Sequence, residues 1–329
     1  MASGAGVFRG EADVWRSKEG KNRGMGQIEQ GCAAGVSDNR QTSIIPLGAH
    51  RFMTQPIARA DSPVAPRPAD TSAPAQAAPR VWAVVPCGGS GSRAGAGLPK
   101  QYRLLAGQPV LAHTLTALAQ VPELSGLLLA IAPQDAVFDA GHPGLPVQGW
   151  QSLPTVMART ARARGWLCVA RCAGESRAHT VLNGLRACVA EHGATPSDWV
   201  LVHDAARCLV RPQAVSAFVR ACQADAVGGL MAIPLPDTLK QAANGRVAAT
   251  VPRHDKWLAQ TPQMFRLGAL LAALEAAVPA GFASITDESS AMEQQGHAPL
   301  LVLGSPDNIK LTYPADFALA ESIVKERLS

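Results

Sequence analysis

Residues 81–93 read VWAVVPCGGSGSR, an apolar run that passes directly into a glycine-rich segment. The apolar part is short and rich in valine, which predicts a buried β-strand. The glycines after it allow the backbone to come close to a ligand and to turn successive N–H groups toward it. The stretch therefore predicts a strand followed by a ligand-binding loop.

Short apolar runs of the same kind recur along the chain, with helical patterns between them. The further predicted strands are Leu127–Ala132, Leu167–Ala170, Trp199–Val202, Gly229–Ile233 and Leu300–Leu303. The predicted helices are Pro109–Gln120, Ala178–Glu191, Pro212–Ala224, Arg266–Val278, Thr286–Gln295 and Pro314–Arg327. Buried strands that alternate with helices indicate an α/β fold with a doubly wound, mainly parallel sheet. Because ligands of such sheets bind beyond the carboxyl ends of the strands, the candidate site residues are those that follow each strand.

One segment breaks this alternation. Asp237–Pro252 carries Asn244-Gly245 between two short strand-like runs, and Asn-Gly is a strong signal for a two-residue β-hairpin turn. A hairpin that projects from an α/β sheet cannot bury both of its faces alone. We therefore expect residues of about 237–257 to form an arm that packs on a second subunit, and we predict a homodimer.

Composition separates the first 80 residues from the rest and limits the possible functions. Residues 56–79 are rich in Pro, Ala and Ser, so residues 1–80 are predicted to be a disordered extension and linker that precedes one folded domain over 81–329. The net charge of +5 and the 5% aromatic content argue against nucleic-acid binding. No stretch approaches the roughly 20 apolar residues of a membrane helix. The odd number of cysteines, with no secretory leader before them, indicates reduced thiols in a cytoplasmic protein.

Two basic residues accompany the glycine-rich loop. Arg93 lies in it, and Lys100 follows within Pro99-Lys100-Gln101-Tyr102. Cations beside exposed backbone N–H groups predict a cradle for a polyphosphate. The loop lacks the Lys-Ser/Thr of a P-loop and the acidic ribose partner of a dinucleotide fingerprint, which disfavours a nicotinamide-dependent dehydrogenase. The alternative is a glycine turn with two solvated cations.

Charged residues also follow later strands. Asp204 lies just beyond the strand Trp199–Val202, where a carboxylate could hold Mg²⁺ on phosphate oxygens; the alternative is a strand-end cap or a salt bridge with Arg207. His203 is interpreted as a structural hydrogen-bonding partner. Lys310 could reach the same crevice or be a solvated surface lysine. Thr286-Asp287-Glu288 is interpreted as a helix N-cap with acidic residues at the positive end of the helix dipole.

Eight ordered motifs resemble the 2-C-methyl-D-erythritol 4-phosphate cytidylyltransferase family over about residues 81–327. They are the glycine-rich loop with Arg93, the run 99–102, the segment 174–185, the runs 202–207, 237–240 and 260–263, the run 286–288 and the run 308–310. The resemblance implies a Rossmann-like nucleotidyltransferase fold over 81–329 that transfers CMP from CTP to 2-C-methyl-D-erythritol 4-phosphate in the non-mevalonate isoprenoid pathway. Cys87 and Gly88 depart from the family, which usually has two alanines there, and residues 135–164 are longer than typical.

The resemblance also implies roles for individual residues. The nucleotide would be bound by Cys87, Gly88, Gly89, Gly91, Gly174, Glu175, Thr180, Asp204 and Ala205. The catalytic cations would be Arg93, Lys100 and Lys310, and Asp204 would hold Mg²⁺. The acceptor would be bound by Arg207 and Thr261, and by Thr238 and Arg253 from the arm of the partner subunit.

The implied reaction needs no general base, because a phosphate monoester with a second pKa of about 6 is already largely dianionic at neutral pH. The obstacle is the approach of two anions, which the three catalytic cations and Mg²⁺ would offset. Two alternatives share the nucleotide loop. A ribitol-5-phosphate cytidylyltransferase would differ in its acceptor pocket, and a non-catalytic CTP-binding module would not need all three cations.

Overall fold

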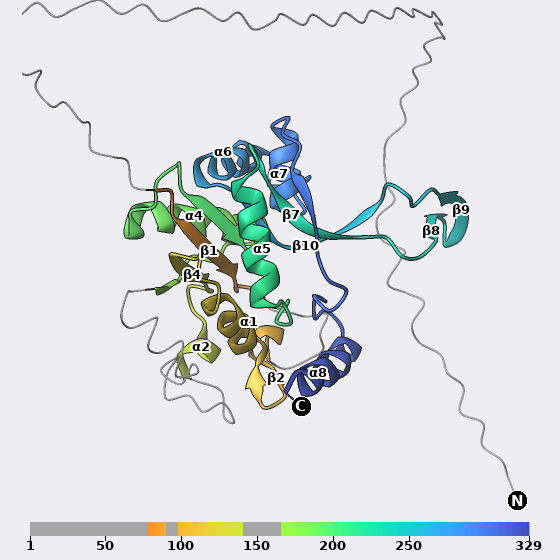
Figure 1. The fold of residues 1–329 in the computed structure, drawn as a ribbon, viewed down its shortest axis with the longest axis horizontal. Helices are drawn as coiled ribbons and strands as arrows, with labels where there is room; N and C mark the ends of the chain where they lie inside the picture. Colours follow the sequence, from red (N-terminus) through yellow and green to blue (C-terminus); the bar gives the residue numbers. More distant parts are fainter. Residues whose placement is uncertain (1–77, 90–97, 141–165, 329) are drawn as a thin grey trace, which may run out of the picture. The chain divides into compact units, whose positions relative to one another are not determined.

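The computed structural model describes residues 78–89, 98–140 and 166–328, and a seven-stranded sheet forms its centre (Figure 1). The strands are β1 (Val81–Pro86), β4 (Gly126–Ala130), β5 (Leu167–Ala170), β6 (Trp199–Val202), β7 (Gly228–Pro234), β10 (Trp257–Arg266) and β11 (Leu300–Leu303). Their order across the sheet is β11-β7-β10-β6-β1-β4-β5. Strand β10 runs antiparallel to both β6 and β7, and the other neighbouring pairs are parallel, so the predicted mainly parallel sheet is confirmed.

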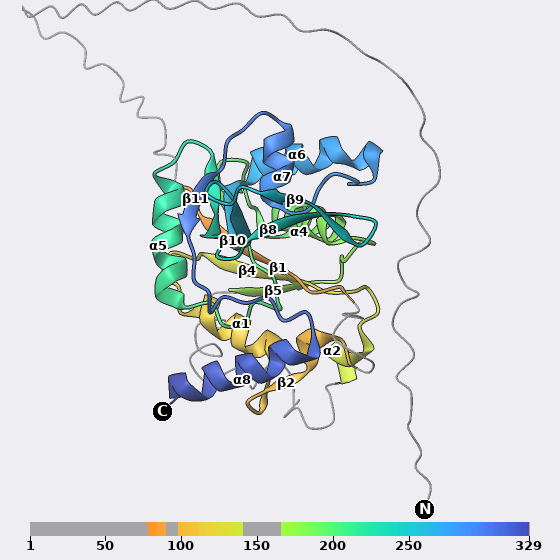
Figure 2. The ribbon, with the colours of Figure 1, turned by 90° about the vertical axis from the view of Figure 1, so that its right-hand side faces the viewer.

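Helices cover both faces of this sheet. The longer ones are α1 (Val110–Ala119), α4 (Arg177–His192), α5 (Pro212–Gln223), α6 (Leu267–Ala277), α7 (Glu288–Gln294) and α8 (Pro314–Leu328), all close to their predicted bounds. The short elements are η2 (Lys100–Tyr102), β2 (Leu104–Leu105), β3 (Gln108–Pro109), α2 (Ala136–Ala140) and η4 (Val278–Ala280). Figure 2 shows α4, α6 and α7 on one side of the sheet and α1 and α8 on the other. Within the described ranges, no helix combines the length and apolarity that crossing a bilayer requires.

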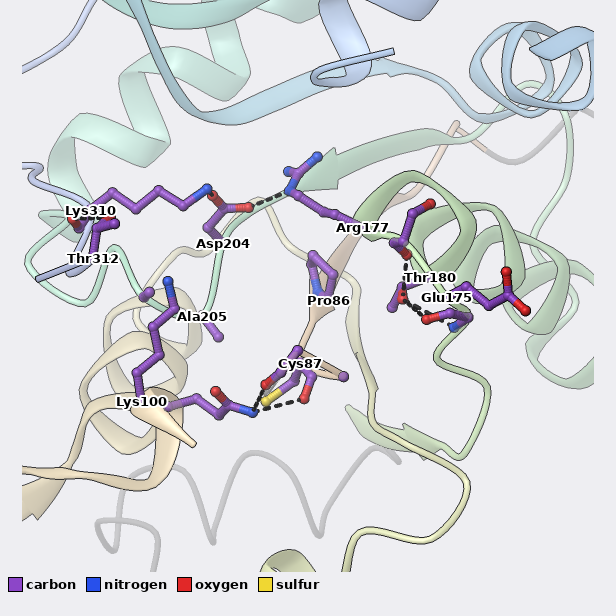
Figure 3. Close-up of a pocket in the computed structure, with 16 residues that line it drawn as sticks. Pro86, Cys87, Lys100, Glu175, Arg177, Thr180, Asp204, Ala205, Lys310 and Thr312 are labelled. Carbon is purple, nitrogen blue, oxygen red and sulfur yellow. Dashed lines mark hydrogen bonds and ion pairs between the residues drawn. The ribbon is translucent and has the colours of Figure 1, made fainter. Parts of the chain in front are cut away.

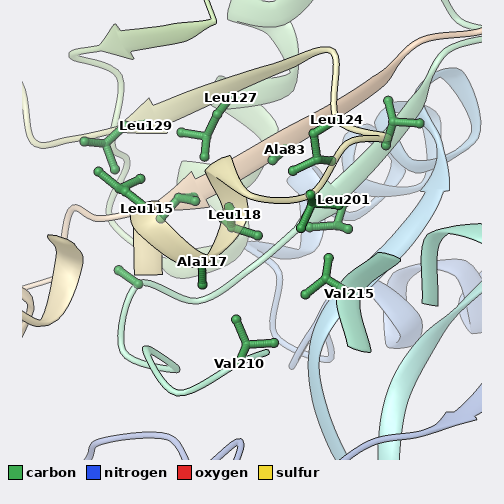
Figure 4. Close-up of a cluster of buried hydrophobic side chains, with 14 of the residues drawn as sticks. Ala83, Leu115, Ala117, Leu118, Leu124, Leu127, Leu129, Leu201, Val210 and Val215 are labelled. Carbon is green, nitrogen blue, oxygen red and sulfur yellow. The ribbon is translucent and has the colours of Figure 1, made fainter. Parts of the chain in front are cut away.

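The sequence of strand β1 is apolar throughout and does not alternate with polar residues, because both faces of the strand are buried. Val81, Ala83 and Val85 pack into a core with α1 and α5, part of which Figure 4 shows. Trp82 and Val84 point to the opposite face and pack into a second core with α4 and α6. A strand that is buried on both faces needs apolar side chains at every position.

Strand β10 was not predicted from the sequence. Pro262 lies inside it, and proline cannot donate a hydrogen bond to a sheet ladder, so it argues against a central strand. The structure accommodates the proline at a break in the register with β7 between Ala259 and Gln263, and the Thr261–Pro262 peptide bond is cis. The break lets Pro262 lie within the strand, so the motif 260–263 is part of the sheet.

The predicted hairpin is present. Strands β8 (Leu239–Ala243) and β9 (Arg246–Val251) pair in antiparallel fashion and lie at the end of an extension of β7 and β10 (Figure 1). Asn244 and Gly245, the two turn residues, have φ values of 50° and 73°, as a type I′ turn requires. Nearly all residues of both strands are exposed. Packing of this arm on a second subunit stays a prediction.

Two predictions fall largely where the structure gives no description. Residues 1–77 of the predicted extension and residues 141–164 of the longer segment lie outside the described residues. The domain boundary at residue 80 therefore stays a prediction.

Candidate active site

A cavity of about 420 Å³ lies beyond the carboxyl ends of β1 and β6 (Figure 3). Its volume falls within the range of small-molecule sites. Ten of the predicted site residues line it, namely Cys87, Gly88, Gly89, Lys100, Gly174, Glu175, Thr180, Asp204, Ala205 and Lys310. Gly91 and Arg93, predicted for the same site, lie outside the described residues.

The start of the glycine-rich loop is held in place by the segment that follows it. The Gln101 side-chain Nε2 donates hydrogen bonds to the carbonyl oxygens of Cys87 and Gly89, at 3.2 and 3.0 Å. The Cys87 side chain is buried, and burial raises the pKa of its thiol to about 12. Cys87 therefore stays protonated and packs into the core.

A second rim of the cavity is formed by the residues that begin α4. The Ser176 hydroxyl caps the helix by accepting from the His179 backbone N–H. The Thr180 hydroxyl accepts from the Gly174 N–H at 3.1 Å and donates to the Ser176 carbonyl at 2.9 Å. Thr180 thus ties this rim to the helix, and Glu175 extends along it (Figure 3).

Asp204 is the centre of a charge cluster at the cavity. Its Oδ1 accepts from Arg177 Nε at 2.7 Å, and its Oδ2 lies 2.6 Å from Lys310 Nζ. Burial alone would raise the pKa of Asp204, but the Arg177 and Lys310 cations outweigh burial and hold that pKa below its usual range. Asp204 is therefore an anion at neutral pH. Its salt bridges are with Arg177 and Lys310, and not with Arg207 as in the alternative interpretation.

The two predicted catalytic lysines come from distant parts of the chain. Lys100 belongs to η2, and its Nζ donates to the Leu311 carbonyl at 3.0 Å. The Leu311 N–H in turn donates to the Ala206 carbonyl at 2.9 Å, which ties the segment that carries Lys310 to the end of β6. In the view of Figure 3 both lysines lie toward one side of the cavity and Glu175 toward the other.

His203 and Thr261 lie behind the cavity and brace it. His203 Nε2 lies 3.1 Å from the Arg207 carbonyl, which can only accept, so Nε2 carries the proton and Nδ1 accepts. The Thr261 hydroxyl then donates to Nδ1 and accepts from the Asp204 N–H at 3.0 Å. Burial lowers the pKa of His203 to about 4, so the imidazole is neutral and structural, as the sequence analysis expects.

The residues predicted to bind the acceptor are not among those that line the described cavity. Thr261 is buried, and Arg207 donates to the carbonyl oxygens of Asn308 and Ala259 at 2.6 and 3.3 Å. Thr238 and Arg253 are exposed on the arm, and Arg253 donates to the Pro236 carbonyl. Within this single chain, neither arm residue lines the cavity.

Arg177 and Gln101 also line the cavity, although neither was predicted to be a site residue. Both lie in motifs of the family resemblance, Arg177 just before a predicted helix and Gln101 beside Lys100. Their partners, Asp204 and Cys87, lie elsewhere in the chain, so local sequence carries no signal of either contact.

The donor set limits how a metal could bind. In the described ranges, no group of three or more His, Cys, Asp or Glu side chains is placed to hold an ion. Asp204 supplies one carboxylate at the cavity, which fits Mg²⁺ only if phosphates of a ligand complete the coordination, as is common for this ion.

A family model described as "IspD: 2-C-methyl-D-erythritol 4-phosphate cytidylyltransferase" matches residues 81–148 and 161–326. The chain belongs to this family. A bifunctional IspD/IspF enzyme of Albidiferax ferrireducens is 50% identical over 270 residues, which make up 82% of this chain and 57% of that protein. A 2-C-methyl-D-erythritol 4-phosphate cytidylyltransferase of Burkholderia multivorans is 46% identical over 248 residues, 75% of this chain and 96% of that protein.

Solved structures of the IspD family have the same fold. A crystal structure of 4-diphosphocytidyl-2C-methyl-D-erythritol synthase matches with a TM-score of 0.59 and 32% identity, over 75% of this chain and 98% of that chain. The IspD structure from Francisella tularensis matches with a TM-score of 0.59 and 28% identity, over 74% of this chain and 99% of that chain. The family resemblance and the nucleotidyltransferase fold class are thereby confirmed.

Proposed function

We propose that this chain transfers CMP from CTP to 2-C-methyl-D-erythritol 4-phosphate and releases pyrophosphate. One observation carries the proposal: in a chain of the IspD family, Lys100, Lys310 and the anionic Asp204 surround one cavity beyond the glycine-rich loop. The family match and the names of the relatives support both substrates.

The reaction is a displacement at phosphorus. An oxygen of the acceptor phosphate forms a bond to the α-phosphorus of CTP, and the bond from that phosphorus to the bridging oxygen of the β-phosphate breaks. The electron pair leaves with pyrophosphate. The attacking oxygen is already ionised at neutral pH, so no side chain has to remove a proton. His203 is not among the residues that line the cavity, and both of its ring nitrogens have hydrogen-bond partners within the protein.

Cations do the catalytic work by offsetting the repulsion between the two substrates. Lys100 and Arg93 would bind the triphosphate, and Lys310 would hold the acceptor phosphate and the charge that develops at the α-phosphorus. Asp204 together with phosphate oxygens would hold Mg²⁺, whose charge adds to this compensation. Binding and orientation of two anions by fixed cations account for the rate enhancement.

The remaining assignments follow from the same proposal. Gly174, Glu175 and Thr180 form a rim of small and hydrogen-bonding groups that would surround the cytosine and ribose. The acceptor would contact Arg207 and Thr261, and the arm of a second subunit would bring Thr238 and Arg253 to it. The exposure of the arm in the single chain supports a homodimer.

We propose a cytoplasmic location because the described cysteines are free.

Pyrophosphate release tests the function directly. The full chain is incubated with CTP, MgCl₂ and one acceptor, either 2-C-methyl-D-erythritol 4-phosphate or ribitol 5-phosphate. We expect release with the first acceptor and with CTP in preference to ATP, GTP or UTP. Release with ribitol 5-phosphate alone would replace the acceptor assignment. CTP binding without release from either acceptor would show a binding module.

A further inference from the structure

The guanidinium of Arg177 is shared between two carboxylates. Its Nε donates to Asp204 Oδ1 at 2.7 Å. Its two terminal nitrogens, Nη1 and Nη2, donate to Glu288 Oε1 and Oε2 at 2.8 and 3.1 Å. Glu288 therefore forms a bidentate ion pair with Nη1 and Nη2 of the guanidinium, and Nε remains to donate to Asp204.

Glu288 is more deeply buried than a capping or surface role requires. Its side chain is 1% exposed, whereas the Arg177 side chain is 27% exposed and borders the cavity. Removing a carboxylate from water is costly unless strong pairing offsets the cost. Glu288 does not line the cavity, so its pairing with Arg177 is its link to the site.

The position of Glu288 is set by the central sheet. Gln263, on β10, donates from Nε2 to Asp287 Oδ2 at 2.8 Å and accepts from the Ser289 N–H at 2.7 Å. These two contacts flank Glu288 at the start of α7 and join the helix to β10. The Asp287 side chain also caps the helix by accepting from the Ser290 N–H. Glu288 thus has a rigid support.

The geometry makes the two oxygens of Asp204 unequal. Oδ1 is held by Arg177, whose orientation Glu288 fixes. Oδ2 is held by Lys310, a flexible side chain that is 38% exposed and can move away when a ligand binds. Without Glu288, the Arg177 guanidinium would be free to rotate and to donate to both Asp204 oxygens. Such a bidentate pair is the arrangement that arginine and carboxylates favour.

We propose that Glu288 is a positioning residue that acts through Arg177 to keep the Oδ2 atom of Asp204 available to a divalent cation. The inference rests on the proposed function, in which Asp204 and phosphate oxygens of CTP hold Mg²⁺. It assigns the buried Glu288–Arg177 pair to the nucleotide site and not only to the stability of α7.

Binding of CTP without the acceptor tests this role, because no turnover is involved. Calorimetric titrations of CTP into wild type and Glu288→Gln are carried out over a series of MgCl₂ concentrations. The expected result is a rise of roughly 10- to 100-fold in the MgCl₂ concentration that gives half-maximal CTP binding, the usual effect of losing a residue that orients a metal ligand. At saturating MgCl₂ the CTP affinity of the variant returns to near that of wild type.

Glu275→Gln is the matched control. Glu275 pairs with Arg186 at 3.0 Å between α6 and α4; both side chains are about half exposed, and neither lines the cavity. We expect this variant to keep the MgCl₂ requirement of wild type. If Glu288→Gln does not fold, Arg177→Lys replaces it, because lysine keeps the charge but lacks the fork, and the same rise is expected.

Three outcomes overturn the proposal. An unchanged MgCl₂ requirement in the folded variant shows that Glu288 does not act on the metal site. A loss of CTP binding that excess MgCl₂ does not restore shows a merely structural role. If wild type itself binds no CTP at any MgCl₂ concentration, the proposed function fails, and the positioning role fails with it. The first two outcomes differ from this one because in them wild type still binds CTP.

Discussion

A Cβ atom added to Gly88 would lie 2.2 Å from the Cβ of Ala173. Gly88 follows β1 in the glycine-rich loop, and Ala173 belongs to the segment between β5 and α4, so the two rims of the cavity meet at this contact. The glycine at position 88 therefore has a steric reason in this chain.

This contact predicts a reciprocal pair of substitutions. Gly88→Ala would push the loop away from α4, and overpacking of this kind costs about 1–3 kcal/mol. We expect a lower Tm and a higher KM for CTP, with both restored by adding Ala173→Gly. Gly89→Ala is the control for Tm, because among the described residues no atom lies within 4 Å of a Cβ at that position. Failure of the double variant to recover would show that the two rims do not touch.

Removal of either cavity lysine should slow the reaction and leave the fold intact. Lys100→Ala and Lys310→Ala each delete one preorganised cation, and losing one such group costs on the order of 10²–10³ in rate. The measurement is kcat from pyrophosphate release at saturating substrates, with Tm as a check on folding. Lys325→Ala, which breaks a pair with Glu321 on the surface of α8, should keep wild-type kcat. Near-normal turnover of a folded Lys310→Ala enzyme would remove Lys310 from the mechanism.

Mixed dimers test whether the arm serves the neighbouring cavity. Arg253→Ala should mainly raise KM for the acceptor, and Asp204→Ala should abolish turnover. When the two variants share a dimer, the cavity of the first subunit keeps its own Asp204 and receives an intact Arg253 from the second. Activity should therefore recover after co-refolding. Without recovery, Arg253 acts within its own subunit or not at all.

The buried His203 predicts a loss of stability in mild acid. Burial lowers its pKa from 6.5 to about 4, so between these values the unfolded chain takes up a proton that the folded chain does not. Stability is therefore present above the unfolded pKa and falls as pH falls through this window. From about pH 7 to about pH 5 the expected loss is about 2 kcal/mol.

Urea unfolding at these two pH values measures the effect. In His203→Gln the titrating group is gone, and the pH dependence should shrink by that amount. His254→Gln, at an exposed position of the arm, should keep the dependence of wild type. An equal pH dependence in wild type and His203→Gln would mean that the pKa of the His203 imidazole is the same in the folded and unfolded chains.

The fold was predictable where local patterns and global packing agree. The apolar runs 81–86 and 199–202 are buried on both faces, so their composition identifies them as central strands. Asn244-Gly245 specified the hairpin because only residues that tolerate positive φ fit its turn. Strand β10 escaped prediction because Pro262 contradicts a strand locally and is tolerated only at a break in the register.

The sequence by itself showed that Asp204 follows a predicted strand, and the family resemblance implied that Lys100 and Lys310 share its site; the structure brings all three to one cavity. The sequence also determined the family, through motifs in a fixed order. Only the tertiary structure decided how these charges pair. Arg177 and Glu288 are 111 residues apart, and each has the local appearance of an ordinary residue at the start of a helix. A buried ion pair depends on distance and desolvation, which are properties of the packed chain and leave no local pattern.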